Sequence, residues 1–151
     1  MLRTVLLAYN GTREGRKSLA RFTNVISPGE VDIHLLAVVR VPTGAFLAES
    51  FVPASIMEEE RSRYEEVARE GVGLLTERGY RATPHVAYGE PVEEIVELAS
   101  SLHADLIVVG HARKTSMAQR WWKSSVGASL IEVAPCSVLI AIEPAGEEAK
   151  K

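Results

Sequence analysis

The chain has 151 residues, of which 46% are hydrophobic and 25% are charged, and its formal net charge at pH 7 is −3. This length and composition are typical of one globular domain that folds without crosslinks, and the slightly acidic charge argues against a nucleic-acid partner. A single cysteine, Cys136, excludes an internal disulfide, and the apolar run near the N-terminus is too short to cross a membrane. We therefore expect a cytoplasmic protein with no membrane partner.

The first half of the chain alternates between strand-like and helix-like segments. Residues 2–10, rich in valine and leucine, predict a strand, and residues 13–26 predict a helix. The inward face of this helix is expected to comprise Leu19, Ala20, Phe22 and Val25. Residues 31–41 predict a central strand, residues 42–55 a long loop, and residues 56–79 a charged helix with a solvated outer face.

The second half continues the alternation. Residues 80–88 predict a weaker strand at an edge of the sheet, because Pro84 cannot donate a ladder hydrogen bond. The remaining predicted elements are a helix at residues 91–102, a strand at 104–110, a helix at 121–133 and a strand at 136–142. The alternation predicts a single α/β domain over residues 1–143, with a Rossmann-like, open, five-stranded parallel sheet covered by helices on both faces, and a polar tail at residues 144–151.

In such a sheet, ligands bind outside the carboxyl ends of the strands, where the strand order reverses. The residues expected at this edge include Val39, Gly89 and those from Gly110 onward. The two aspartates, Asp32 and Asp105, stand at strand beginnings, at the opposite edge. No nucleophile and base can be paired from the sequence, so we expect no dedicated enzyme.

The four histidines lack the paired spacing of a metal site, so no bound metal is expected. His34 and His85 stand within predicted strands, which favours structural roles. His111 alone lies at the expected ligand edge. Cys136 is expected to pack as a small apolar residue.

The stretch GHARKTSMAQRWWKSSVG follows the apolar run ADLIVV. A glycine that closes a buried strand, followed by a basic, hydroxyl-rich loop and a helix, is where many α/β proteins hold a phosphate. The loop carries cations, among them Arg113, and Ser124 and Ser125 are suited to cap the helix that follows. The alternative is that these are ordinary solvated cations and caps.

Three patterns resemble the universal stress protein family, and together they cover nearly the whole chain. They are VLLAYNGTREGRKSL, VAYGEPVEEIVELASSLHADLIVVG and SSVGASLIEVAPCSVLIAI. The resemblance implies a sheet in the order 3-2-1-4-5 and a homodimer formed through the last strand, from Cys136 to Ile142. That strand is apolar and terminal, so a partner strand is a natural cover for it.

Nucleotide-binding members of this family carry a signature of Gly, two residues, Gly, nine residues, Gly, and then Ser or Thr. Gly110 matches the first glycine, but Arg113 and Lys123 stand at the next two glycine positions. Alignment backward from Ala134-Pro135-Cys136 instead places Ser124 and Ser125 at the last two positions. Either way two glycines are absent, which weakens a backbone cradle for phosphate, and we favour solvated cations over a triphosphate site.

The first turn also departs from the family pattern, because Asn10 stands where nucleotide binders usually have an aspartate. An amide can bond an adenine or a ribose but has no charge to hold a metal ion, and Asn10 is equally well explained as a turn residue before Gly11.

The resemblance implies a stress-response regulatory module with a degenerate adenine-nucleotide site for ATP or AMP. The candidate binding residues are Asn10, Gly11, Thr12, Val39, Gly89, Gly110, His111, Arg113, Ser124 and Ser125. Two alternatives stay open: a genuine ATP or AMP binder with slow ATP hydrolysis, and a protein-interaction dimer with no nucleotide.

Overall fold

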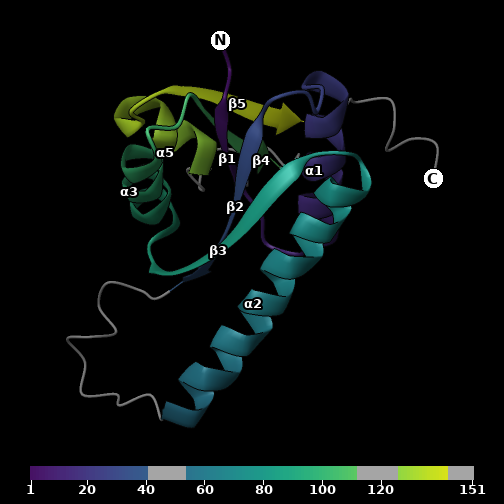
Figure 1. Cartoon of the computed structure of the whole chain (residues 1–151). Coiled ribbons are helices and arrows are strands. Elements are labelled where there is room, and N and C mark those ends of the chain that lie inside the picture. The colour runs from purple at the N-terminus through teal and green to yellow at the C-terminus, as the bar shows by residue number, and fades with distance from the viewer. Residues whose placement is uncertain (41–53, 112–125, 143–151) are drawn as a thin grey trace, which may run out of the picture.

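The computed structural model describes residues 1–40, 54–111 and 126–142. All strand pairs in it are parallel, and they form one five-stranded sheet in the order β3-β2-β1-β4-β5 (Figure 1). The strands are β1 (Thr4–Ala8), β2 (Asp32–Arg40), β3 (Arg81–Gly89), β4 (Leu106–His111) and β5 (Ser137–Ile142). The predicted number, order and direction of the strands are confirmed, including the position of β3 at an edge.

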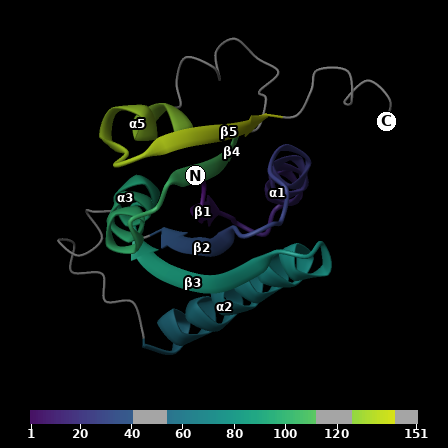
Figure 2. The same ribbon diagram turned by 45° about the horizontal axis from the view of Figure 1, so that its top comes forward.

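Helices cover both faces of the sheet, as predicted. Figure 2 shows α1 (Arg13–Val25) and α2 (Ala54–Glu77) on one side, and α3 (Pro91–Leu102) and α5 (Val126–Val133) on the other. Alternate residues of a strand serve the two sides, since successive side chains point to opposite faces. In β1, Val5 and Leu7 join the core under α1 and α2, whereas Leu6 joins the core under α3 and α5.

The long charged helix α2 rests on the sheet through small residues. Its buried residues are Ala68, Gly71 and Leu75. A Cβ atom built on Gly71 would lie 2.5 Å from Cδ1 of Leu35 and 2.8 Å from Cδ1 of Tyr9. The helix therefore sits so close to β1 and β2 that only a glycine fits at this crossing.

One prediction about α1 is wrong, and two others fall wholly or partly outside the described residues. Val25, expected on the inward face of α1, is 58% exposed because it lies in the last turn, after the helix has passed its buried contacts at Leu19 and Phe22. The described part of the last helix begins at Val126, so the predicted start at residue 121 lies outside the described residues. The predicted loop at residues 42–55 also lies outside them, except for its last two residues, which form the start of α2 rather than loop. None of the described helices has both the length and the apolar character that a membrane span requires.

Candidate functional site

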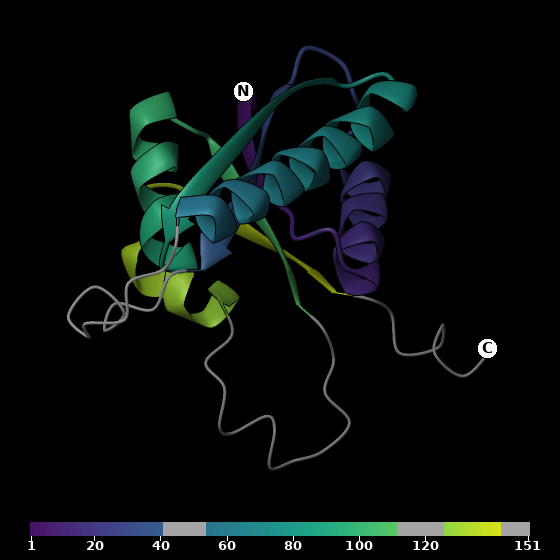
Figure 3. The ribbon, with the colours of Figure 1, turned by 90° about the horizontal axis from the view of Figure 1, so that it is seen from below.

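A pocket of about 250 Å³ opens at the carboxyl ends of the central strands. Its apolar floor consists of Ala8 of β1, Leu36 and Val38 of β2, and Val109 of β4. Strand order reverses here, because the chain leaves β1 toward β2 on one side and β4 lies on the other. Figure 3 views the molecule from the side at which β1 ends. The pocket thus lies where the sequence predicts a ligand site.

The first turns of two helices close the other side of this pocket. Pro91 and Ile95 belong to α3, and Val126 begins α5. Proline suits the first position of a helix because its fixed φ matches the helix and its missing N–H would have no partner there. The walls of the pocket are therefore largely apolar and set on rigid elements.

The polar rim of the pocket comes from the turn between β1 and α1. Oδ1 of Asn10 accepts hydrogen bonds from the backbone N–H of Thr12 at 3.1 Å and from its hydroxyl at 2.7 Å. Oγ1 of Thr12 in turn accepts from the N–H of Gly15 at 3.0 Å, which makes Thr12 the N-cap of α1. The amide oxygen of Asn10 is therefore committed to the turn, and only its NH₂ group is left to address a ligand. The left-handed residue of this turn is Gly11, with φ of 74°, rather than Asn10.

Gly110 has a packing role in addition to any role toward a ligand. A Cβ atom at Gly110 would overlap the hydroxyl and the Cβ of Ser18. The end of β4 passes against α1 because Gly110 has no side chain. This contact explains the glycine without reference to phosphate, which the sequence alone did not reveal.

The predicted site residues are brought together only in part. Asn10 and Gly110 line the pocket, and Gly11 and Thr12 form the turn beside it. The remaining predicted residues within the described part of the chain, Val39, Gly89 and His111, do not line it.

The positions of these three residues explain why. Val39 alternates with Val38, the β2 residue that does line the pocket, so its side chain faces α1 and α2. Gly89 ends β3 beside Glu94 of α3, and His111 is the last residue of β4. Arg113, Ser124 and Ser125 lie outside the described residues.

Two polar residues of α1 were missed in the sequence. Glu14 and Ser18 both line the pocket, and the hydroxyl of Ser18 donates to the backbone carbonyl of Glu14 at 3.0 Å. Their spacing of four places them on one helix face together with the turn at Asn10, a pattern that could have indicated the rim. Glu14 is the only charged residue among the described lining residues, so this part of the pocket is acidic.

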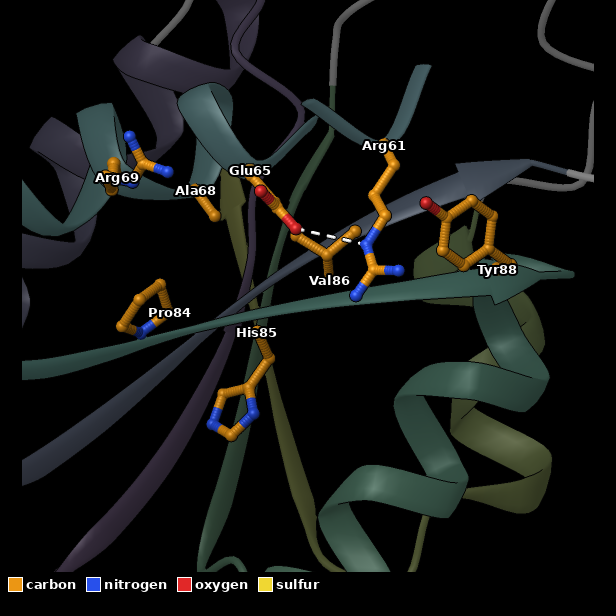
Figure 4. A pocket seen from close by; sticks show the side chains of 8 residues that line it. All are labelled: Arg61, Glu65, Ala68, Arg69, Pro84, His85, Val86 and Tyr88. Carbon is orange, nitrogen blue, oxygen red and sulfur yellow. Dashed lines mark hydrogen bonds and ion pairs between the residues drawn. The ribbon is translucent and has the colours of Figure 1, made fainter. Parts of the chain in front are cut away.

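A second hollow, of about 300 Å³, lies between α2 and the edge strand β3 (Figure 4). Its charges are already paired along the helix: Nε of Arg61 lies 3.2 Å from Oε1 of Glu65, and Arg69 pairs with Glu66 at 3.3 Å. These pairs are the solvated helix face that the sequence predicts. The hollow lies beside the edge strand and not where the strand order reverses, so we place the candidate site in the central pocket instead.

The model of the universal stress protein family matches residues 1–141 of the chain. The chain belongs to this family. Universal stress protein YxiE of Bacillus subtilis is 29% identical over 150 residues, which span 93% of this chain and 99% of the relative. The resemblance drawn from the three sequence patterns is thereby confirmed.

Solved universal stress proteins share the fold. A universal stress protein in complex with cAMP has a TM-score of 0.69 and 22% identity, covering 91% of this chain and 95% of that one. A family protein from Arabidopsis thaliana with AMP bound has a TM-score of 0.65 and 16% identity, covering 96% and 94%. At these identities the likeness establishes the fold of this family member, not its ligand.

Proposed function

We propose that this universal stress protein is a cytoplasmic regulatory module of the stress response that binds an adenine nucleotide weakly in the central pocket. The observation that carries the proposal is the pocket itself, with an apolar floor at the reversal of strand order and the NH₂ group of Asn10 at its rim. An adenine ring combines an apolar face with polar edges, and this lining suits both.

The solved relatives support the choice of ligand class. One was crystallised with cAMP and another with AMP, and both share this sheet and its helices. The described pocket, at about 250 Å³, is just below the usual range of small-molecule pockets, roughly 300 to 1,000 Å³. It suits the nucleoside end of the ligand, with the phosphates directed toward Gly110. The candidate phosphate contacts Arg113, Ser124 and Ser125 lie outside the described residues.

Weak binding follows from the charges and the missing glycines. Glu14 brings a negative charge to the same rim that a phosphate approaches. Asn10 supplies no charge for a metal ion, and Arg113 stands where a glycine would let a phosphate reach the backbone. These features favour a degenerate site that senses a nucleotide over one that hydrolyses it.

We also propose a homodimer through the segment from Cys136 to Ile142, which contains β5 (Ser137–Ile142). Within the described residues β5 ends the sheet, and its last residue, Ile142, is 42% exposed. The adjoining helix exposes Ile131 by 68% and Val133 by 54%. A second copy that pairs along this edge would satisfy the open backbone groups and cover these apolar side chains.

Calorimetric titration tests the nucleotide site. The nucleotide-stripped protein is titrated with AMP, cAMP and ATP, with and without Mg²⁺. Val38→Phe fills the pocket floor, and Val25→Phe makes the same change at an exposed position of α1. We expect saturable binding that is lost in Val38→Phe and kept in Val25→Phe. Absence of heat at millimolar nucleotide in the parent protein would refute the site and favour the interaction dimer, whereas Mg²⁺-dependent ATP binding with turnover would favour the slow ATPase.

A further inference from the structure

His34 and His85 lie together on neighbouring strands although 51 positions separate them in the chain. Nδ1 of His34 is 2.8 Å from Nε2 of His85, the ring centroids are 5.1 Å apart, and the ring planes are inclined by 38°. The β2–β3 register pairs His34 with Thr83 and Leu36 with His85, so the two histidines are diagonal neighbours on one face of the sheet.

Neither histidine lines the central pocket, whereas His85 belongs to the strand segment that lines the hollow beside α2. Leu6 and Leu36 lie in register with the histidines and belong to the core under α3 and α5, so both rings are on that face. Figure 4 shows His85 directed away from α2, on the other side of β3 from Arg61 and Glu65. Both rings are only half-buried, so ions in solution have a short path to them.

Neither imidazole is held by a carboxylate: across the described ranges 1–40, 54–111 and 126–142, neither ring forms an ion pair with one. Neutral imidazole is the form that binds a metal.

We propose that His34 and His85 are two adjacent ligands of a divalent late transition metal, with Cu²⁺ preferred. Two nitrogens that each bind a metal at about 2.0 Å and at a right angle are about 2.8 Å apart, whereas a tetrahedral angle separates them by about 3.3 Å. The observed 2.8 Å is the separation of the hydrogen bond between the rings, and two nitrogens this close can both reach one metal ion once the rings turn. Cu²⁺ also has the highest affinity for nitrogen ligands in the divalent series.

Metal binding requires the proton that the two rings share in their hydrogen bond to move to another nitrogen. In the hydrogen-bonded pair, one of the two facing nitrogens carries a proton. When the metal binds, that ring moves its proton to its other nitrogen, Nε2 of His34 or Nδ1 of His85, and each ring turns so that both lone pairs meet at the metal. When each ring carries one proton, the pair thus accepts the cation without a net loss of protons.

Two protein ligands make a reversible site. Among the residues that the structure describes, no third histidine, cysteine, aspartate or glutamate joins the pair. The other coordination positions are therefore open to water or to a small ligand, and a chelator in excess should remove the metal.

The test is titration of the full chain, without an affinity tag, with CuCl₂ in a buffer that does not coordinate copper. Calorimetry is expected to show one Cu²⁺ per chain, and electron paramagnetic resonance to show coordinated imidazole nitrogens. His34→Gln and His85→Gln should each weaken binding at least tenfold. The matched control is His103→Asn, because His103 caps α3 with φ of 51°, a conformation that asparagine tolerates.

Unchanged copper binding in both glutamine variants would overturn the proposal, as would absence of stoichiometric binding to the parent protein. If a variant fails to fold, as judged by circular dichroism, an NMR titration of the parent protein with Cu²⁺ still tests the site. Substoichiometric Cu²⁺ should broaden the imidazole NMR signals of His34 and His85 before those of His103. Equal broadening of all three would refute the site. None of these measurements depends on nucleotide binding.

Discussion

The two ends of the β1–β4 pair are built in opposite ways. At the amino end, Oδ2 of Asp105 accepts hydrogen bonds from the backbone N–H groups of Arg3 at 3.0 Å and Thr4 at 2.9 Å, and the strands are tied together. At the carboxyl end, Asn10 turns the chain away into α1, Gly110 has no side chain, and a pocket opens between them. The same strand pair is therefore closed where it begins and open where it ends, which is why a ligand site belongs at the carboxyl end.

The largest expected effect on stability comes from disrupting the close contact of α2 with Leu35 and Tyr9, which lie near the open end. Gly71→Ala would drive a Cβ into Leu35 and Tyr9, the residue that follows β1, and should lower the free energy of unfolding by about 2 kcal/mol. Gly73→Ala is the matched control on the same helix, where nothing lies within 4 Å of the added Cβ. It should stabilise the protein by roughly 0.5–1 kcal/mol, because alanine favours the helix. Urea unfolding measures both, and equal effects of the two changes would contradict the close contact.

The next largest effect concerns the contact between Gly110 at the end of β4 and Ser18 of α1. Gly110→Ala should cost about 1–2 kcal/mol of unfolding free energy, because the new Cβ overlaps Ser18. Adding Ser18→Ala removes the nearest atom and should restore part of the loss. A double-mutant cycle measures this coupling, and strictly additive effects would show that the contact with Ser18 is not the cause.

The turn at the open end gives a smaller effect. Asn10→Ala removes the acceptor for the N–H and hydroxyl of Thr12 and should cost about 1 kcal/mol of unfolding free energy. Asn10→Asp keeps an acceptor near the start of α1 and should stay within about 0.5 kcal/mol of the parent protein. Thermal unfolding compares the two, and a loss as large in Asn10→Asp as in Asn10→Ala would argue against the turn role of the amide oxygen.

The closed end predicts a small, pH-dependent effect. Hydrogen bonds from the backbone of Thr4 and Arg3 lower the pKa of Asp105 below its ordinary value of 3.8. A carboxylate with a lowered folded-state pKa stabilises the fold fully above its unfolded pKa, and this stabilisation is lost as the pH falls from 3.8 toward the folded value.

Asp105→Asn should therefore be less stable than the parent near pH 6, and the difference should shrink below pH 3.8. Urea unfolding as a function of pH measures it. A difference that stays constant down to pH 2.5 would show that the charge is not what ties the strands.

Much of the fold could be predicted because the relevant signals are local. Val5, Leu6 and Leu7 mark a buried strand by their own chemistry, and Pro84 marks an edge because it lacks a donor. Val25 shows the limit of such patterns. It fits the apolar period of α1, but exposure at a helix end depends on where the neighbouring elements stop.

The candidate site could be predicted only in outline. The sequence predicts a phosphate contact at Gly110, whereas the contact of Gly110 with Ser18 depends on how α1 lies against β4. The pairing of His34 with His85 depends on the β2–β3 register, and a one-residue slip would place the rings on opposite faces. Neither relation has a signature in residue spacing.

The sequence by itself determined the family, the alternation of strands and helices, and the edge of the sheet at which a ligand should be sought, because these follow from residue chemistry and short-range periodicity. Only the tertiary structure decided that Asn10 commits its oxygen to the turn, that Val38 rather than Val39 faces the pocket, and that two distant histidines touch. Such contacts depend on the register and approach of whole elements, which many distant residues set together.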